Sequence, residues 1–136
     1  MAQAVEVGAS ASRTKTVTRE DIALFAQVSG DTNPVHLDPS YAQTTQFGKP
    51  IAHGMLSVSV ISAILGNDLP GHGTIYLGQD VKFKAPVYVG DTITATVECT
   101  AYRTDKRIAT FKTTVSNQDG VLVLEGQAVV LAPALE

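Results

Sequence analysis

The stretch from Met55 to Leu65 constrains the fold more than any other part of the chain. As a helix it would be apolar on nearly every side, interrupted only by Ser57, Ser59 and Ser62. A helix that is apolar all round is expected to be buried all round. The rest of the chain must therefore supply a surface that covers it.

The second half of the chain follows a different hydrophobic period. Apolar residues alternate with polar ones over 81–85 and again over 93–101. Alternation over such lengths predicts half-buried strands. Two further strands, near 108–117 and 121–132, complete a predicted antiparallel meander, with turns that contain glycine or aspartate between them.

A long buried helix followed by a long-stranded antiparallel sheet predicts an α+β fold in which the sheet curls around the helix. The chain has 136 residues, which suits one domain, over 1–136, with one core. A curled sheet has exposed edges, which proteins usually pair or cover. We therefore expect edge-to-edge pairing into a homodimer.

Composition and charge exclude several classes of partner. The formal net charge is −3, and no cluster of Lys and Arg points to nucleic acid. The longest apolar runs, such as 121–124, are too short to cross a membrane, and the first residues lack a signal-peptide pattern. The single cysteine, Cys99, alternates with apolar residues and is expected to be a small buried side chain rather than a reactive thiol. The expected location is cytoplasmic.

Two segments before the long helix carry capping signals. Thr18, followed by two acidic residues, predicts an N-cap, and Gly30 is expected to end that helix. Asp38, followed by a proline, predicts a second short helix over 39–46.

Asp31 and His36 lie between these segments, in what must be a turn. Because Asn33 precedes Pro34, we expect the chain to leave helix here and to place His36 in an extended or irregular segment. On one interpretation, Asp31 and Asn33 bond nearby backbone as turn formers, and His36 is a satisfied, partly buried histidine. On the other, Asp31 and His36 form an acid/base pair that binds one water, because histidine titrates nearest neutral pH and a partly desolvated aspartate can accept a proton. Spacing alone leaves both interpretations open.

Gly54 is the third candidate, because it opens the long helix. A helix N-terminus offers unpaired N–H groups and a positive dipole end, and glycine lets a ligand approach the backbone. A thioester oxygen placed there would be polarised, and developing enolate charge would be stabilised. The alternative is a tight strand-to-helix junction. Ser62, two turns further on, can either bond a group in a pocket or bond back to the carbonyl four residues earlier.

Other kinds of site find little support. Ser57 is not in the Gly-x-Ser-x-Gly turn of serine hydrolases. The three histidines, His36, His53 and His72, lack a metal-binding spacing, so no metal site is predicted. Phosphate-binding glycine loops and dinucleotide fingerprints are also absent from the sequence.

Residues 31–38 (DTNPVHLD) followed by 50–56 (PIAHGML) resemble the MaoC-like, (R)-specific enoyl-CoA hydratases. The likeness is to the short single-domain type that supplies (R)-3-hydroxyacyl-CoA for polyhydroxyalkanoate synthesis. It continues through 65–71, 75–79 and 83–91, and so covers nearly the whole chain. The resemblance implies a hot-dog fold, with an antiparallel sheet wrapped around a central helix from Gly54 to Gly66, and a homodimer with a shared sheet.

The resemblance also implies roles for single residues. The family's catalytic acid and imidazole fall on Asp31 and His36, and its amide facing the thioester oxygen falls on Gly54. Asn33 is expected to steady the loop, and Ser62 matches a serine that lines the family's site.

An acyl pocket is expected along one stripe of the helix. Val58, Ser62 and Leu65 lie on that stripe by their spacing, and Val130 on the final strand is the opposite wall by resemblance. Leu65 and Val130 are bulky enough to close a short pocket, so we expect acyl chains of about four to six carbons, with a graded cutoff.

The implied reaction is reversible syn hydration of a trans-2-enoyl-CoA to (R)-3-hydroxyacyl-CoA. It needs no metal or redox cofactor, and CoA enters only as part of the substrate. A rival enzyme is a hot-dog thioesterase, which commonly carries an acid on the central helix, whereas Met55 to Leu65 contains none. A rival of another class is a non-catalytic acyl-CoA-binding module, against which the presence of both Asp31 and His36 counts.

Overall fold

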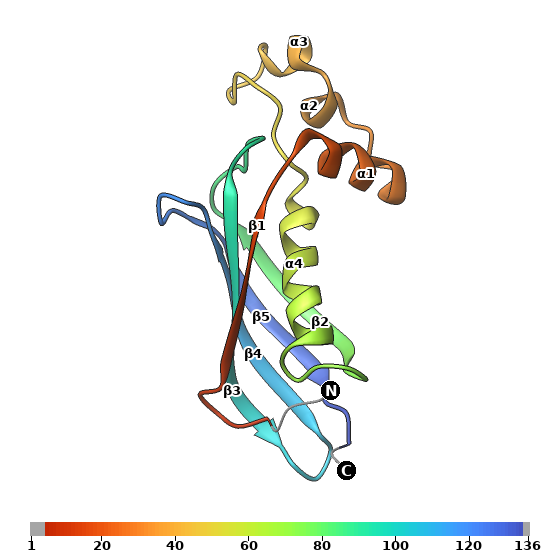
Figure 1. Cartoon of the computed structure of the whole chain (residues 1–136), viewed down its shortest axis with the longest axis vertical. Helices are drawn as coiled ribbons and strands as arrows, with labels where there is room; N and C mark the ends of the chain where they lie inside the picture. Colours follow the sequence, from red (N-terminus) through yellow and green to blue (C-terminus); the bar gives the residue numbers. More distant parts are fainter. Residues whose placement is uncertain (1–4, 135–136) are drawn as a thin grey trace.

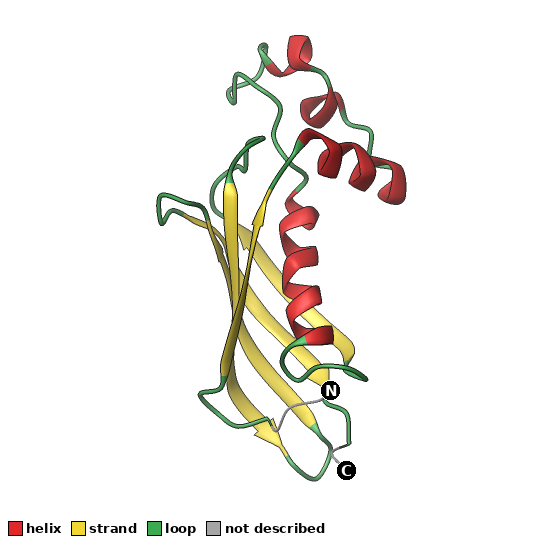
Figure 2. Ribbon diagram, viewed as in Figure 1, coloured by secondary structure: helices red, strands yellow, loops and turns green. Residues whose placement is uncertain are grey.

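Five antiparallel strands form one sheet, and one long helix lies against it. The computed structural model describes residues 5–134, and Figure 1 labels each element. In chain order these are β1 (Ser10–Thr16), α1 (Arg19–Ser29), α2 (Pro34–Leu37), α3 (Pro39–Ala42), α4 (Gly54–Asn67), β2 (Ile75–Phe83), β3 (Thr92–Arg103), β4 (Ile108–Ser116) and β5 (Leu122–Leu131). The sheet curves around α4, which lies along the strands (Figure 2). This arrangement confirms the predicted α+β hot-dog fold.

The strand order is β1-β3-β4-β5-β2. Strands β3, β4 and β5 form the predicted meander, but β2 does not join it in chain order, because it pairs with β5 at the far edge. Residues 84–91 make the crossing from β2 to β3. Their backbone bonds to β5 at Val123 and to the segment before α4 at Ala52, over N–O distances of 2.7 Å in each case. The crossing therefore forms a wall close to the start of α4.

Strand β1 has no counterpart among the predicted elements. Its residues are almost all polar and exposed, so no apolar alternation marks it as a strand. It is held at the sheet edge by pairing with β3, including hydroxyl contacts such as Ser12 to Thr96 at 2.8 Å and Thr16 to Thr92 at 2.9 Å. Such cross-strand pairs stabilise a strand whose own sequence gives little hydrophobic signal.

The core lies between α4 and the curved sheet. Ile61 and Ile64 of the helix and Phe111 of β4 are fully buried there, in one cluster with buried residues of β3, β4 and β5. The expectation that α4 is buried on all sides is wrong for the single chain, because the sheet covers only one side. Met55, Ser59 and Ser62 are exposed on the other side.

The capping predictions are confirmed. The Thr18 hydroxyl accepts from the Asp21 N–H at 3.1 Å, and the Asp21 carboxylate accepts from the Thr18 N–H at 2.9 Å, which closes a capping box at the start of α1. Gly30 ends α1 with a φ of 80°, in the left-handed region that glycine adopts without strain. Asp38 caps α3 as predicted, but that helix stops at Ala42, short of the expected Gln46.

His36 lies in α2, so the expected extended segment is wrong. Proline restricts the residue before it and fits the first turn of a helix itself. The Asn33 side chain accepts from the Val35 N–H at 3.1 Å, which makes Asn33 the N-cap of a single helical turn. This turn directs the His36 side chain toward Ile51, in the segment before α4.

Cys99 is 1% exposed, which confirms a buried small residue, and burial raises the pKa of its thiol. Within residues 5–134, none of the helices has the length and hydropathy needed to span a membrane.

Candidate active site

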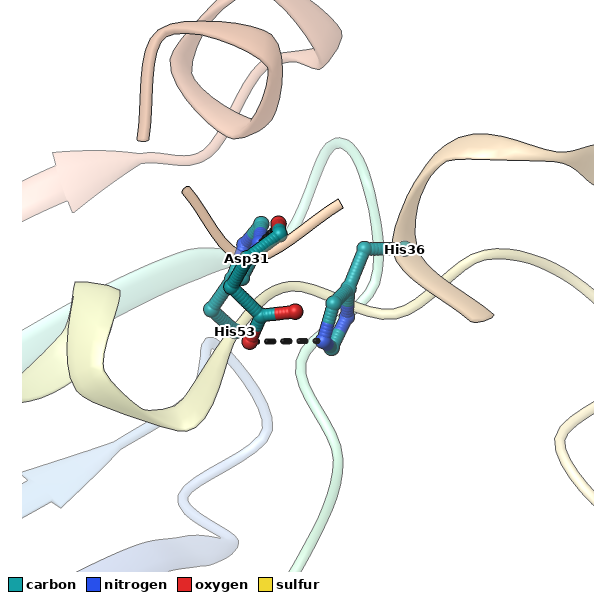
Figure 3. Close-up of side chains that lie close together, drawn as sticks. All are labelled: Asp31, His36 and His53. Carbon is teal, nitrogen blue, oxygen red and sulfur yellow. Dashed lines mark hydrogen bonds and ion pairs between the residues drawn. The ribbon is translucent and has the colours of Figure 1, made fainter. Parts of the chain in front are cut away.

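The three residues of Figure 3 come from three separate segments that meet at the N-terminal end of α4. Asp31 lies in the loop that follows the cap of α1, His36 lies in α2, and His53 directly precedes α4. The backbone joins these segments, because the Ile51 N–H donates to the Val35 carbonyl at 3.2 Å. The predicted acid and imidazole are therefore brought together.

The Asp31 carboxylate faces the His36 ring, with 3.9 Å between Oδ2 and Nε2 (Figure 3). This separation is too long for a direct hydrogen bond but allows one water to bond to both atoms. The Asp31 side chain is 52% exposed, whereas that of His36 is only 11% exposed. Solvent thus reaches the acid while the imidazole is largely enclosed.

The orientation of His36 is set by its other nitrogen. Nδ1 lies 2.7 Å from the carbonyl oxygen of Ile51. Because a carbonyl only accepts, Nδ1 carries the proton and donates it. In the neutral ring, Nε2 then presents a lone pair toward Asp31, so a water between them faces two proton acceptors.

The structure shows the predicted turn and is compatible with the acid/base pair, which stays a prediction. One carboxylate oxygen of Asp31, Oδ1, accepts from the Asn33 N–H at 3.2 Å and so forms the predicted turn. The other oxygen, Oδ2, faces His36. The turn therefore fixes the carboxylate that the predicted acid/base pair would use, and Asn33 steadies the same loop through its own bond to Val35.

Gly54 is the first residue of α4, so its N–H lies outside the helix's own bonding pattern. A Cβ at this position would lie 2.5 Å from Cε1 of Phe83. A side chain at residue 54 would therefore displace the Phe83 ring.

A pocket of about 430 Å³ opens at this point. Its polar lining includes His36, His53, Gly54 and Ser57, and its apolar lining includes Phe83 of β2 and side chains of the crossing segment. Such a pocket suits a thioester, because its polar end can hydrogen-bond the carbonyl and its apolar wall can contact the acyl tail.

The predicted acyl stripe lies further along α4. Val58, Leu65 and Val130 are buried and belong to one core cluster, while Ser62 is exposed on the open side of the helix. None of these four is among the described residues that line the pocket. Their assignment to the acyl site stays a prediction.

Two polar residues at the site had no role assigned from the sequence. His53 is 3% exposed, its Nε2 lies 2.9 Å from the Asp31 carbonyl oxygen, and its ring stacks on that of His36 with 3.9 Å between centroids. Ser57 is buried in the first turns of α4, and its Oγ has no hydrogen-bond partner within residues 5–134. The only sequence signal for either was proximity to Gly54, since the partners of His53 lie far away in the chain and Ser57 Oγ has none among the described residues.

Asp31, His36 and His53 each offer a ligand atom, and these atoms lie within 4.8 Å of one another. Sequence spacing did not predict this grouping, because the fold brings distant residues together. His36 Nδ1 and His53 Nε2 are both engaged with backbone carbonyls, which leaves one nitrogen on each ring and one carboxylate. The absence of a required metal stays a prediction.

Comparison with known proteins gives a consistent result. Residues 1–121 match the model of the MaoC-like domain. The chain is 52% identical over 132 residues to the (R)-specific enoyl-CoA hydratase of Aeromonas caviae, covering 97% of this chain and 98% of that one. It is 53% identical over 130 residues to the (R)-specific enoyl-CoA hydratase of Rhodospirillum rubrum, covering 96% and 90%.

A solved structure agrees with these relatives. The (R)-hydratase from A. caviae involved in PHA biosynthesis superposes with a TM-score of 0.92 at 52% identity, over 97% of this chain and 100% of that one. The chain therefore belongs to the MaoC-like family, as the resemblance of residues 31–38 and 50–56 predicts.

Proposed function

We propose that this chain is an (R)-specific enoyl-CoA hydratase, which catalyses reversible syn hydration of trans-2-enoyl-CoA to (R)-3-hydroxyacyl-CoA. The observation that carries the proposal is the 3.9 Å approach of Asp31 Oδ2 to His36 Nε2 beside a pocket that contains Gly54. The names of the relatives from A. caviae and R. rubrum support the same reaction and the (R) product. The product can supply polyhydroxyalkanoate synthesis or enter fatty-acid metabolism.

Gly54 activates the substrate. The thioester oxygen accepts a hydrogen bond from the Gly54 N–H at the positive end of α4, which withdraws electrons from the conjugated double bond. The β-carbon becomes electrophilic, and the enolate that forms when it is attacked keeps its negative charge at the same N–H.

Asp31 and His36 activate the water. Two acceptors face it, so its two protons point toward the enzyme and an oxygen lone pair points toward the β-carbon. Asp31 takes one proton as the oxygen bonds to the β-carbon. A proton is then returned to the α-carbon from the same side, either from the carboxyl or through His36, which gives syn addition and restores the enzyme. The pair acts as a unit.

The reaction adds water and transfers no electrons between molecules. The proposal therefore includes no metal or redox cofactor, and CoA enters as part of the substrate. Prolonged chelation followed by dialysis is expected to leave turnover unchanged. A loss that zinc or another divalent cation restores would show that Asp31, His36 and His53 hold a metal instead.

The proposed assembly is a homodimer. Among residues 5–134, strand β2 pairs only with β5 and leaves its other edge open, and it carries the exposed apolar side chains Ile75, Leu77 and Phe83. Pairing this edge with a second copy would cover them. Light scattering should give about twice the 14.3 kDa chain mass, and a fully active monomer would contradict this part of the proposal. The proposed location is the cytoplasm, where a buried free thiol such as Cys99 needs no pairing.

A hot-dog thioesterase is the closest rival, and α4 argues against it because Gly54–Asn67 contains no acidic residue. Crotonyl-CoA distinguishes the two reactions and the non-catalytic alternative in one assay. Hydration removes the enoyl absorbance without releasing thiol, hydrolysis releases thiol that a colorimetric reagent detects, and a binding module does neither. Coupling to an (S)-specific 3-hydroxyacyl-CoA dehydrogenase should give no signal, and a strong signal would contradict the (R) assignment.

A further inference from the structure

His53 occupies the N-cap position of α4 without capping it. Its side chain makes no hydrogen bond to the N–H groups of the first turn. Yet the imidazole is 3% exposed, and burying a polar ring is unfavourable unless its nitrogens find partners. The reason for its burial therefore lies outside the helix that it precedes.

The partner of the ring is the backbone of Asp31. Nε2 of His53 lies 2.9 Å from the Asp31 carbonyl oxygen, across 22 positions of sequence. The carbonyl can only accept, so Nε2 carries the ring proton and donates it. This bond ties the residue before Gly54 to the residue that carries the catalytic carboxylate.

The ring itself is held on two sides. One face stacks on His36, with 3.9 Å between centroids and 29° between planes, and Phe25 of α1 lies at 4.9 Å in a tilted arrangement. With the proton on Nε2, Nδ1 has only a lone pair, and that atom is enclosed without a hydrogen-bond partner in the described part of the chain. The enclosed nitrogen cannot exchange protons with solvent or substrate directly, so the ring suits a fixed contact rather than proton transfer.

We propose that His53 is a positioning residue, which acts through its Nε2–H bond to fix the Asp31 main chain and hence the place of the Asp31 carboxylate opposite His36. The inference rests on the proposed roles of Asp31 and His36. The loop at Asp31 is otherwise held by short-range bonds, from the Asn33 N–H to Asp31 Oδ1 and from the Asp31 N–H to the Ser29 hydroxyl. Those bonds shape the turn, whereas the bond from His53 anchors the turn to the central helix and to the Gly54 amide.

Two substitutions separate the hydrogen bond from the ring. His53→Phe keeps an aromatic ring against His36 and Phe25 but has no donor. His53→Gln loses the ring but keeps an N–H at nearly the reach of Nε2. Because small displacements of a catalytic group lower the rate steeply, His53→Phe should lower kcat by about 10-fold or more, with KM and the unfolding midpoint nearly unchanged. His53→Gln should retain clearly more of the wild-type kcat.

A loss of kcat in His53→Gln that equals or exceeds the loss in His53→Phe would overturn the proposal. A His53→Phe enzyme with wild-type kcat would also overturn it. A further comparison uses Asp31→Asn, which removes the proton acceptor. In that background His53→Phe should cost little more, because the placement of an amide that takes no proton no longer limits the rate. If His53→Phe lowers kcat by the same factor in the Asp31→Asn background as in wild type, His53 does not act through the Asp31 carboxylate.

These outcomes are distinguishable from failure of the proposed function, which would appear as near-native turnover in Asp31→Asn alone. Should His53→Phe fail to fold, the proton position in the wild-type protein still tests the inference. Nitrogen-15 NMR of the histidine side chains should find the His53 proton on Nε2. A proton on Nδ1 would remove the bond to Asp31 and overturn the proposal.

Discussion

The ring of Phe83 occupies the space that a side chain at residue 54 would need, because a Cβ on Gly54 would lie 2.5 Å from Phe83 Cε1 and 2.8 Å from Cζ. Phe83 is the last residue of β2 and is itself exposed, so its ring can turn away at some cost. Gly54 and Phe83 both line the pocket. A methyl group there would lie beside the proposed thioester site.

Gly54→Ala tests whether that space serves the substrate. We expect the variant to fold, because alanine is a better helix former than glycine, and to lose about 100-fold in kcat because the carbonyl no longer reaches the amide. Phe83→Ala, measured alone and combined with Gly54→Ala, is the control. If relief of the Phe83 contact restores turnover in the double variant, the defect of Gly54→Ala is the clash with Phe83, and the space beside residue 54 is not needed by the substrate.

Asp31→Asn and His36→Gln test the acid/base pair. Both changes keep similar size, so circular dichroism and the oligomeric state should be unchanged. Each should lower turnover of crotonyl-CoA by roughly 100-fold or more if the groups transfer protons. Asp119→Asn, an exposed turn residue far from the site in sequence, is a matched control and should be fully active. Folded variants with near-native turnover would remove the proposed mechanism.

Much of the site was predictable because its signals are local. The capping box of Thr18 and Asp21, the stop at Gly30 and the turn of Asp31 and Asn33 each depend on residues within three positions of one another. The spacing of Asp31 and His36 left both an acid/base pair and a turn with a satisfied histidine open, and only the resemblance of residues 31–38 favoured the pair. Turn and capping bonds of this kind depend mainly on neighbouring residues, so the sequence can indicate them.

The remaining features depend on contacts that no local pattern encodes. Strand β1 is polar, and its pairing with β3 holds it in the sheet. Strand β2 lies at the far edge, and residues 84–91, which lead from it to β3, bond to Val123 and Ala52. His53 has its partner 22 positions away in the chain, so its burial could not be predicted. The exposure of one side of α4 likewise depends on how far the sheet of a single chain extends around the helix.

Ser57→Ala should separate stability from binding. The Ser57 Oγ lines the pocket and has no hydrogen-bond partner among the described residues, so removing it should leave the unfolding midpoint of the free protein unchanged or slightly raised. If the hydroxyl bonds the bound thioester, KM should rise by about 2- to 10-fold, as expected for one neutral hydrogen bond. Ser59→Ala is the control, since Ser59 Oγ donates to the Leu56 carbonyl at 2.5 Å. An unchanged KM in Ser57→Ala would assign Ser57 to packing only.

Asp21 should make stability depend on pH. Its bond from the Thr18 N–H, with Lys15 at 3.1 Å adding to the effect, lowers the pKa of Asp21 from its ordinary value of 3.8. A lowered folded-state pKa stabilises the fold above the ordinary value, and this contribution is lost as pH falls through the lowered pKa.

Asp21→Asn should therefore lower the thermal midpoint at neutral pH, and its difference from wild type should shrink as the pH falls below about 3.8. Glu20→Gln, which changes an exposed neighbour in the same turn, controls for net charge. If the difference in thermal midpoint between wild type and Asp21→Asn persists unchanged in strong acid, the carboxylate charge contributes nothing to stability.

Leu65→Ala tests the predicted acyl stripe. Leu65 is 1% exposed and shares one core cluster with Val58 and Val130, so truncation should lower the free energy of unfolding by about 2–5 kcal/mol. If Leu65 also closes the acyl site, the lost side chain deepens it and raises activity on an eight-carbon enoyl-CoA relative to a four-carbon one. The shift should be graded, because a methylene in an apolar pocket is worth only about 1–3 kcal/mol.

Ile64→Ala is the matched control for that experiment, because Ile64 is equally buried on the same helix but lies off the stripe of Val58, Ser62 and Leu65. Both variants should lose stability, and only Leu65→Ala should change the ratio of the two activities. The ratio is independent of how much enzyme stays folded, since both substrates meet the same active fraction. A Leu65→Ala enzyme that loses stability but keeps the wild-type ratio would show that Leu65 belongs to the core alone and that the acyl chain leaves the pocket by another route.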